Sequence, residues 1–203
     1  QLRKMDLSKV KLMWLNYPNM PTGAKADHTF FTELVSFAKE YNILICHDNP
    51  YTFILNDHPL SIFNAAGADE VAIELISLSK CYNMAGWRVG AVIGAKPYID
   101  TIMTFRSNMD SGMFKPIQEA AAVALGMGRD WIENLNMQYQ QRKDAACDIM
   151  DYLQLEHDKN GAGLFVWGKI KDLNLDSEAL ANKILYDSRV FITPGHIFGS
   201  QGD

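Results

Sequence analysis

Short apolar runs alternate with longer amphipathic stretches along the first half of the chain. The apolar runs cover residues 11–15, 43–46, 71–77 and 89–94, and the first is bounded by a cluster of Pro, Asn and Gly, which is typical of a buried strand that feeds a tight loop. Between the first two runs, apolar residues recur at helical spacing and Asp27 is available as the cap: Phe30, Phe31, Leu34, Val35, Phe37, Ala38 and Tyr41. Strands that alternate with helices predict an α/β fold with a mostly parallel sheet.

The second half of the chain has a helical pattern from about residue 96. Residues 113–127 are rich in Ala, and Asp130 with Glu133 resembles a capping box that opens a helix running from residue 131 toward residue 153. Such a helix would be roughly 35 Å long, enough to bridge two domains. Residues 164–170, a helix near 177–186 and residues 190–193 predict a small α+β unit. We therefore expect one domain over residues 1–128 and a bridging helix with a small domain over 129–203.

Composition and charge narrow the class of protein. The chain has 203 residues, of which 48% are hydrophobic and 21% are charged, with a formal net charge of −5. A mildly acidic surface without basic runs argues against a nucleic-acid partner. No apolar stretch approaches the roughly 20 residues needed to span a bilayer, and the first residues lack the apolar core of a signal peptide. We expect a cytoplasmic protein that binds neither nucleic acid nor a membrane.

The cysteines do not predict a disulfide framework or a metal site. Cys46, Cys81 and Cys147 are widely separated and odd in number. Three possible metal ligands follow one another in Cys46-His47-Asp48, but consecutive strand residues point to opposite faces of a sheet and cannot converge on one ion. We expect no metal, and we treat the histidines as structural.

Polar residues follow the predicted strands at positions where a ligand would bind. Asn19, Asp48, Tyr51 and Lys80 each come soon after a strand, and the carboxyl ends of strands in α/β sheets form ligand-binding crevices. Hydroxyls at Ser77 and Ser79 precede Lys80, and an arginine flanked by glycines, Arg88, follows it: these are groups that bind phosphate. A lysine beside a phosphate site predicts a Schiff base with pyridoxal phosphate.

Four segments of the chain resemble one enzyme family in both order and spacing. The segment 77–90 resembles the family's lysine segment, 16–23 its NPxNPTG loop, 46–51 its D-x-x-Y strand end, and 191–199 its V-x-x-x-PG-x-x-FG segment. The family is the fold-type I pyridoxal phosphate enzymes, in particular the class I/II, aspartate aminotransferase-like aminotransferases. The resemblance covers essentially the whole chain, and it implies that residues 1–128 are the C-terminal part of the cofactor-binding large domain.

The resemblance implies a role for each candidate residue. Lys80 would form the Schiff base and then carry the proton at the substrate's α-carbon as general acid and base. Asp48 would pair with the protonated pyridine nitrogen, and Tyr51 would donate to the ring hydroxyl. Ser77 and Arg88 would bind the phosphate.

The loop at residues 16–23 departs from the family pattern. The family has an asparagine directly before Pro-Thr-Gly, where its amide contacts the ring hydroxyl, but this chain has Met20 there. Asn19 either replaces that asparagine through a local shift of the loop or leaves the contact unmade. The resemblance also makes Met20-Pro21 a candidate cis peptide.

The resemblance implies an aminotransferase that moves an amino group between an amino acid and a 2-oxo acid, in a homodimer. Two alternatives stay open: a β-eliminating C–S lyase with the same cofactor, and the aminotransferase-like sensor domain of a transcription regulator. The family carries half of a large domain before the NPxNPTG loop and a substrate-binding arginine beyond the last segment. We therefore expect a fragment that binds the cofactor poorly and is inactive alone.

Overall fold

A four-stranded sheet forms the body of the fold in the computed structural model, which describes residues 2–171 and 175–202. The strands lie in the order β1 (Leu12–Asn16), β2 (Leu44–Asp48), β3 (Ala72–Ser77) and β4 (Gly90–Gly94). The first three are parallel, and β4 runs antiparallel to β3. The predicted α/β fold with a mostly parallel sheet is confirmed.

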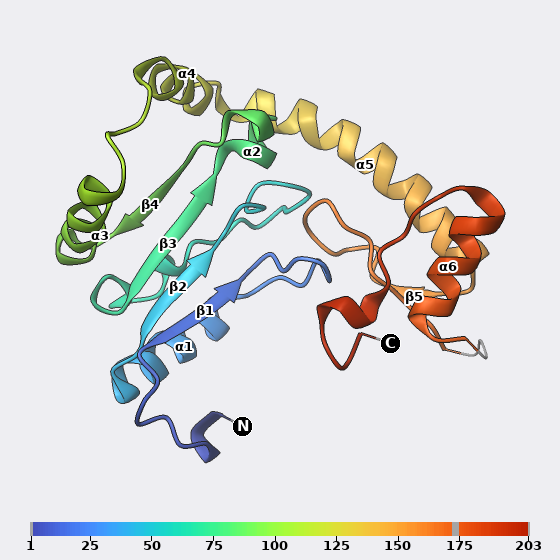
Figure 1. The fold of residues 1–203 in the computed structure, drawn as a ribbon, viewed down its shortest axis with the longest axis horizontal. Helices are drawn as coiled ribbons and strands as arrows, with labels where there is room; N and C mark the ends of the chain where they lie inside the picture. Colours follow the sequence, from blue (N-terminus) through green and yellow to red (C-terminus); the bar gives the residue numbers. More distant parts are fainter. Residues whose placement is uncertain (1, 172–174, 203) are drawn as a thin grey trace.

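Helix α1 (His28–Tyr41) packs against one face of the sheet (Figure 1). Its buried side chains Phe31, Val35 and Ala38 form a core cluster with Ile45 of β2 and others from the sheet and the following loops. The Asp27 side chain accepts a hydrogen bond of 2.7 Å from the Phe30 amide, so the predicted cap is confirmed. Burial of this apolar stripe is what stabilises a helix of this length.

Outside the strands, the chain also forms short helical turns and two further helices. The turns are 3₁₀ helices at Leu2–Lys4, Ile62–Asn64, Ala68–Glu70, Ala85–Trp87 and Gly195–Phe198. A single α-helical turn, α2 (Leu78–Cys81), follows β3 directly and carries Lys80. The helices α3 (Lys96–Met109) and α4 (Lys115–Leu125) then confirm the helical pattern after residue 96.

Helix α5 (Gly128–Tyr152) runs from the end of the sheet to the C-terminal part of the chain (Figure 1). It begins three residues before the predicted start, and Asp130 lies in its first turn rather than at its cap, so the predicted capping box was wrong. The reason is local: only two residues separate α5 from α4, and Gly128 turns the chain with a φ of +74°. The long helix itself was predicted correctly.

The C-terminal part is a small unit with little regular structure. It holds a two-stranded antiparallel ladder of β5 (Glu156–His157) and β6 (Gly168–Lys169), and helix α6 (Ser177–Ser188). Strand was expected over 164–170 and 190–193; only residues 168–169 form one, and 190–193 have no regular structure. Helix α6 is confirmed, with Asp176 accepting from the Ala179 amide at 2.8 Å.

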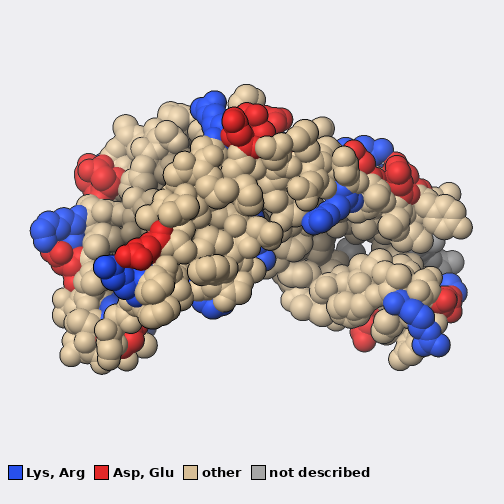
Figure 2. Space-filling view, turned by 90° about the horizontal axis from the view of Figure 1, so that it is seen from above, with Lys and Arg blue, Asp and Glu red and all other residues tan. Residues whose placement is uncertain are grey.

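The charge on the surface bears on nucleic-acid partners, and the apolar character of the helices bears on membranes. In the face shown in Figure 2, lysines and arginines are scattered among acidic residues and form no continuous basic area. Within the described ranges, no helix combines the length and the apolar character that a membrane crossing requires.

Candidate functional site

The carboxyl ends of the three parallel strands meet at one edge of the sheet. Asn16 and Asp48 are paired in register as the last residues of β1 and β2, and Asp48 is level with Leu75 of β3. The Asn16 side chain donates a hydrogen bond of 2.9 Å to the Asp48 carbonyl. From this edge the chain enters α2, so Lys80 lies at the same end of the sheet; in Figure 1 α2 lies beside the start of α5.

Asp48 presents a carboxylate that has no partner among the residues the structure describes. The residue is half-buried, and burial raises its pKa, although the neighbouring His47 partly offsets this. Tyr51 is buried and packs edge-on against Phe165, with ring centroids 5.5 Å apart. Burial, helped by the Asp48 charge, also raises the pKa of Tyr51, so its hydroxyl is a proton donor at neutral pH. The pair offers a negative charge and a donor at one place.

Lys80 is half-buried, and its amino group makes no hydrogen bond or ion pair with residues 2–171 or 175–202. The turn that carries it is held from both sides. Ser77 caps α2 by accepting from the Ser79 amide at 3.2 Å, and the Cys81 thiol donates to the Pro50 carbonyl at 3.6 Å. Since Pro50 directly precedes Tyr51, the lysine turn lies beside the loop that holds the tyrosine.

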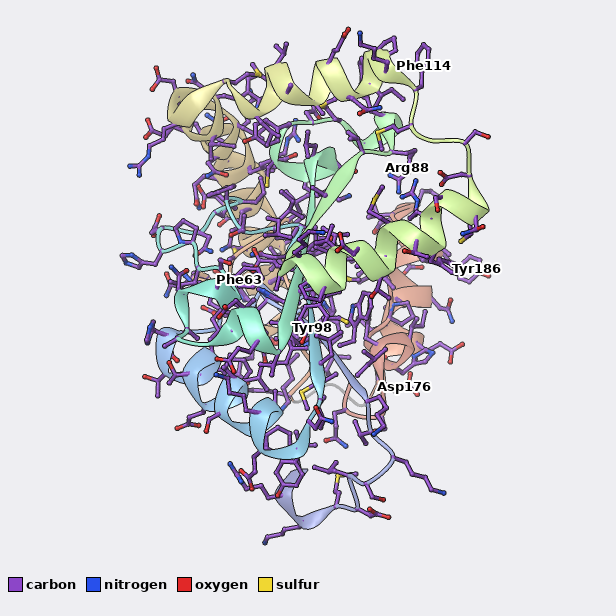
Figure 3. The ribbon with its side chains drawn as sticks, turned by 90° about the vertical axis from the view of Figure 1, so that its left-hand side faces the viewer. Phe63, Arg88, Tyr98, Phe114, Asp176 and Tyr186 are labelled. Carbon is purple, nitrogen blue, oxygen red and sulfur yellow. The ribbon has the colours of Figure 1, made fainter. Side chains whose placement is uncertain are left out.

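Arg88 is exposed and turns back on its own segment. Its guanidinium Nη1 donates to the Ala85 carbonyl at 2.9 Å, and its backbone has a left-handed φ of 52°. Figure 3 labels it on the side of the molecule that bears α3 and α4. In the described part of the chain no hydrogen bond joins it to Ser77. Gly90, two residues after Arg88, must be a glycine because a Cβ at this position would lie 2.5 Å from the Ile76 carbonyl oxygen of β3.

Asn19 holds the loop together rather than facing Asp48. Its side-chain oxygen accepts from the Thr22 hydroxyl at 2.7 Å, and Met20 beside it is exposed. The Met20-Pro21 peptide is cis, as expected. Asn16 is the loop residue that contacts the Asp48 backbone, and its side-chain oxygen also accepts from the Met20 amide at 2.7 Å. Asn16 is the first residue of the segment that resembles the family loop, and the sequence pattern predicts no role for it.

A buried polar pair lies beneath the strand end. The His47 Nδ1 is 2.9 Å from the Glu74 carboxylate, and its Nε2 is 2.9 Å from the Tyr17 carbonyl. The same carboxylate oxygen accepts from the Ser61 hydroxyl and the Ile62 amide, each at 2.9 Å. Burial alone would raise the pKa of Glu74, but these hydrogen bonds lower it below its usual value, so the carboxylate is ionised. The signal in the sequence was a glutamate inside an apolar run.

The groups at this edge fit the cofactor that the sequence predicted. An ionised carboxylate without a partner suits the positively charged nitrogen of a pyridine ring, and the phenol of Tyr51 suits an oxygen on that ring. A lysine amine without a partner suits an aldehyde. The fit rests on the side chains of Asp48, Tyr51 and Lys80, which have no hydrogen-bond or ion-pair partner among residues 2–171 and 175–202, while the groups around them are hydrogen-bonded.

A cavity lies in the small unit, apart from this site. Trp167 packs edge-on against Phe198, with ring centroids 5.6 Å apart, and lines a cavity of about 280 Å³ within the small unit. Among the side chains that the structure describes, no group of three His, Cys, Asp or Glu residues is placed to hold a metal ion.

Comparison with known protein families gives one match over the whole chain. The family model for aminotransferase class I and II matches residues 1–203. Among curated proteins, an LL-diaminopimelate aminotransferase of Dehalococcoides mccartyi is 40% identical over 199 residues, which cover 97% of this chain and 51% of the relative. One from Gloeobacter violaceus is 41% identical over 96% of this chain and 50% of its own length. The chain therefore spans about half the length of these relatives.

Solved structures agree with the family match. The apo form of BacF from Bacillus subtilis is 38% identical, with a TM-score of 0.91, over 100% of this chain and 55% of that one. An aminotransferase from Staphylococcus aureus is 32% identical, with a TM-score of 0.90, over the same shares of the two chains.

Proposed function

The chain belongs to the class I and II aminotransferases, a family that depends on pyridoxal phosphate, and from this membership we propose that the protein moves an amino group between an amino acid and a 2-oxo acid. The names of its relatives support an aminotransferase over a lyase or a sensor domain. We propose LL-diaminopimelate as the first amino donor to test, because the relatives at about 40% identity carry that name.

The observation that carries the proposal is the set of three unpaired groups at the strand ends. Asp48, Tyr51 and Lys80 come from β2, the loop after it and the turn after β3. Each is wholly or partly buried, and each keeps its functional group free of the described neighbours. The pKa values of Asp48 and Tyr51 are both raised, and shifted pKa values in neighbouring groups are characteristic of ligand sites.

We assign the following roles to the chain's own residues. The amino group of Lys80 would hold the cofactor's aldehyde, and the same amino group would take and return the proton at the substrate's α-carbon. The Asp48 carboxylate would stabilise a positive charge on the ring nitrogen, and the Tyr51 hydroxyl would donate to the ring oxygen. When bound, pyridoxal phosphate withdraws electrons from that α-carbon.

Ser77 and Arg88 hold the phosphate in this proposal. Arg88 spends one bond on the Ala85 carbonyl, which leaves the other donors of its guanidinium for phosphate oxygens. Asn19 stays a candidate for the cofactor's ring oxygen, but its contact with Thr22 favours a role in shaping the loop. Asn16 joins the site as the residue that fixes the Asp48 backbone.

We also propose how the chain is divided and what it assembles with. Residues 1–128 are part of the cofactor-binding domain, and 129–203 are the bridging helix with part of a small domain. Large apolar side chains lie exposed along α3 and at the start of α4, among them Phe105, Met109 and Phe114 (Figure 3). A second copy of the protein is the partner we propose, in a cytoplasmic homodimer.

One experiment tests the activity. The whole protein, supplied with pyridoxal phosphate, is given LL-diaminopimelate or a panel of other amino acids together with 2-oxoglutarate. We expect glutamate to form from one or a few donors, together with the matching 2-oxo acid. Release of ammonia and pyruvate, together with sulfide from cysteine or homocysteine from cystathionine, without glutamate formation would instead support the lyase and refute the proposal.

A further inference from the structure

Helix α5 is hydrogen-bonded to the turn that carries Lys80, and that turn is bonded to the loop that carries Tyr51. The indole Nε1 of Trp131 donates to the Cys81 carbonyl at 3.0 Å. The Cys81 thiol in turn donates to the Pro50 carbonyl at 3.6 Å. Cys81 directly follows Lys80 and Pro50 directly precedes Tyr51. Two bonds therefore connect α5 to both cofactor-facing segments.

Asn136, also on α5, closes this arrangement into a ring. Its Nδ2 donates to the Phe53 carbonyl at 2.8 Å, and its Oδ1 accepts from the Leu55 amide at 3.1 Å. One planar amide thus satisfies two backbone groups of the loop that follows Tyr51. Leu55 has a φ of 47°, a conformation that is unfavourable for a residue with a side chain. The bond from Asn136 therefore holds a backbone shape that the loop would not prefer by itself.

The Cys81 carbonyl depends on Trp131 for its hydrogen bond. The Cys81 carbonyl is at the C-terminal end of α2, a single turn, where carbonyls lack partners within the helix. Trp131 supplies that partner from a partly buried position. A partly buried carbonyl that loses its donor costs free energy, so removing the indole N–H allows the lysine turn to shift.

The small unit that follows α5 is hydrogen-bonded to the loop after β1 and to the loop after Tyr51. The Ala162 amide donates to the Gly23 carbonyl at 2.8 Å, and the Gly163 amide donates to the Ile54 carbonyl at 2.8 Å. Ile54 lies between the two loop residues that Asn136 contacts. The loop after Tyr51 is therefore held between α5 and the small unit.

We propose that Trp131 and Asn136 are positioning residues, which fix the separation of Lys80 and Tyr51 by holding both of their segments against α5. This rests on the proposed function, since the separation matters only if both groups act on one cofactor. A lysine that moves by about 1 Å relative to the substrate loses up to about a hundredfold in rate. Neither residue touches the cofactor in this account.

The test uses the whole protein and three variants with a matched control. Trp131→Phe removes the indole N–H donor and the five-membered ring that carries it, but keeps a six-membered aromatic ring. Asn136→Leu removes both amide bonds, and Asn136→Asp keeps the acceptor for Leu55 but replaces the donor to Phe53, in case the leucine variant does not fold. Asn134→Leu is the control, since Asn134 is exposed on the same helix and its side chain makes no hydrogen bond with a described residue.

Two readouts separate positioning from general support of the fold. Hydrogen exchange is measured on the cofactor-free protein; we expect amides of residues 78–84 to exchange about tenfold faster in Trp131→Phe and those of 53–57 in the Asn136 variants. With cofactor, we expect kcat to fall about tenfold or more in both sets, with KM for the amino donor within about twofold. Asn134→Leu should match the wild type in both measurements.

Each outcome decides the matter. Unchanged exchange would show that the bonds do not hold the segments, and faster exchange with an unchanged kcat would show that they hold the fold but not the catalytic geometry; either result overturns the proposal. Because exchange is measured without the cofactor, a wild-type protein that shows no transamination refutes the proposed function separately.

Discussion

The imidazole of His47 and the carboxylate of Glu74 meet at 2.9 Å in the interior of the protein, with side-chain exposures of 0% and 5%. Both ring nitrogens face oxygen atoms, one of Glu74 and one of the Tyr17 backbone. The pair therefore ties β2 to β3 and to the loop after β1, directly beneath the edge where Asp48 lies. It is the buried polar support of the proposed cofactor site.

Replacing Glu74 by glutamine should destabilise the protein by about 3 kcal/mol at neutral pH, because it leaves a buried donor opposite a neutral group. Urea unfolding measures the change, and Glu33→Gln, at an exposed position of α1, is the control. The pKa of Glu74 in the folded protein lies below its ordinary value of 4.5. The contribution of the pair is thus present above about pH 4.5 and is lost as the pH falls through the lower, folded value.

The difference in stability between wild type and Glu74→Gln should therefore shrink in acid. A variant as stable as the wild type at pH 7, or a difference that does not change between pH 7 and acid, would contradict the account of the pair.

Asp48→Asn should have opposite effects on stability and on activity. The pKa of Asp48 is raised in the ligand-free fold, so its ionised form is disfavoured there, and above its ordinary pKa of 3.8 the carboxylate lowers stability. The melting temperature of the cofactor-free variant should therefore rise at pH 7. Transamination should fall by about a hundredfold or more, because the charge opposite the ring nitrogen is lost. Unchanged turnover would remove Asp48 from its proposed role.

Gly23→Ala should cost more than Gly112→Ala, although both glycines have positive φ angles, of 74° and 96°. An alanine strains the backbone at each position, but at Gly23 its Cβ would also lie 2.9 Å from the Ala162 carbonyl, whereas nothing lies within 4 Å at Gly112. We expect Gly23→Ala to be less stable by a further 1–2 kcal/mol, roughly the cost of overpacking. Equal losses in urea unfolding would show that the loop and the small unit do not touch in solution.

Arg88→Ala should weaken binding of pyridoxal phosphate but not of pyridoxal, which lacks the phosphate. Losing charge-assisted hydrogen bonds should raise the Kd for pyridoxal phosphate by about 10- to 100-fold. Equilibrium dialysis with both compounds measures the difference. If the two Kd values rise together, Arg88 acts on the fold and not on the phosphate.

The sheet and the helices could be predicted because their signals are local. Apolar runs fixed the strands to within two residues at either end, and the periodicity of residues 30–41 together with Asp27 gave α1 and its cap. The start of α5 was missed because a left-handed Gly128 takes the chain from one helix into the next, which no capping pattern describes. In the small unit the strands were overestimated, since apolar character there does not lead to a continuous ladder.

The sequence predicted which residues lie at the candidate site, but not the hydrogen bonds that hold the site together. Asp48, Tyr51 and Lys80 follow strands in the sequence, which is enough to place them at one edge of the sheet. The contacts of Asn16, His47 and Trp131 depend on partners 32, 27 and 50 residues away, respectively. Such pairings are set by the tertiary fold, so a reading of local pattern does not find them.

Lys80 carries the proposed covalent link to the cofactor, and chemical reduction tests that link directly. The whole protein is loaded with pyridoxal phosphate, treated with borohydride to fix the Schiff base, digested and analysed by peptide mass spectrometry. We predict the mass of a reduced phosphopyridoxyl group on the peptide that contains Lys80, and its loss in Lys80→Ala but not in Lys96→Ala, whose lysine is exposed on α3. A label on another lysine, or none at all in the loaded wild type, would contradict the central claim.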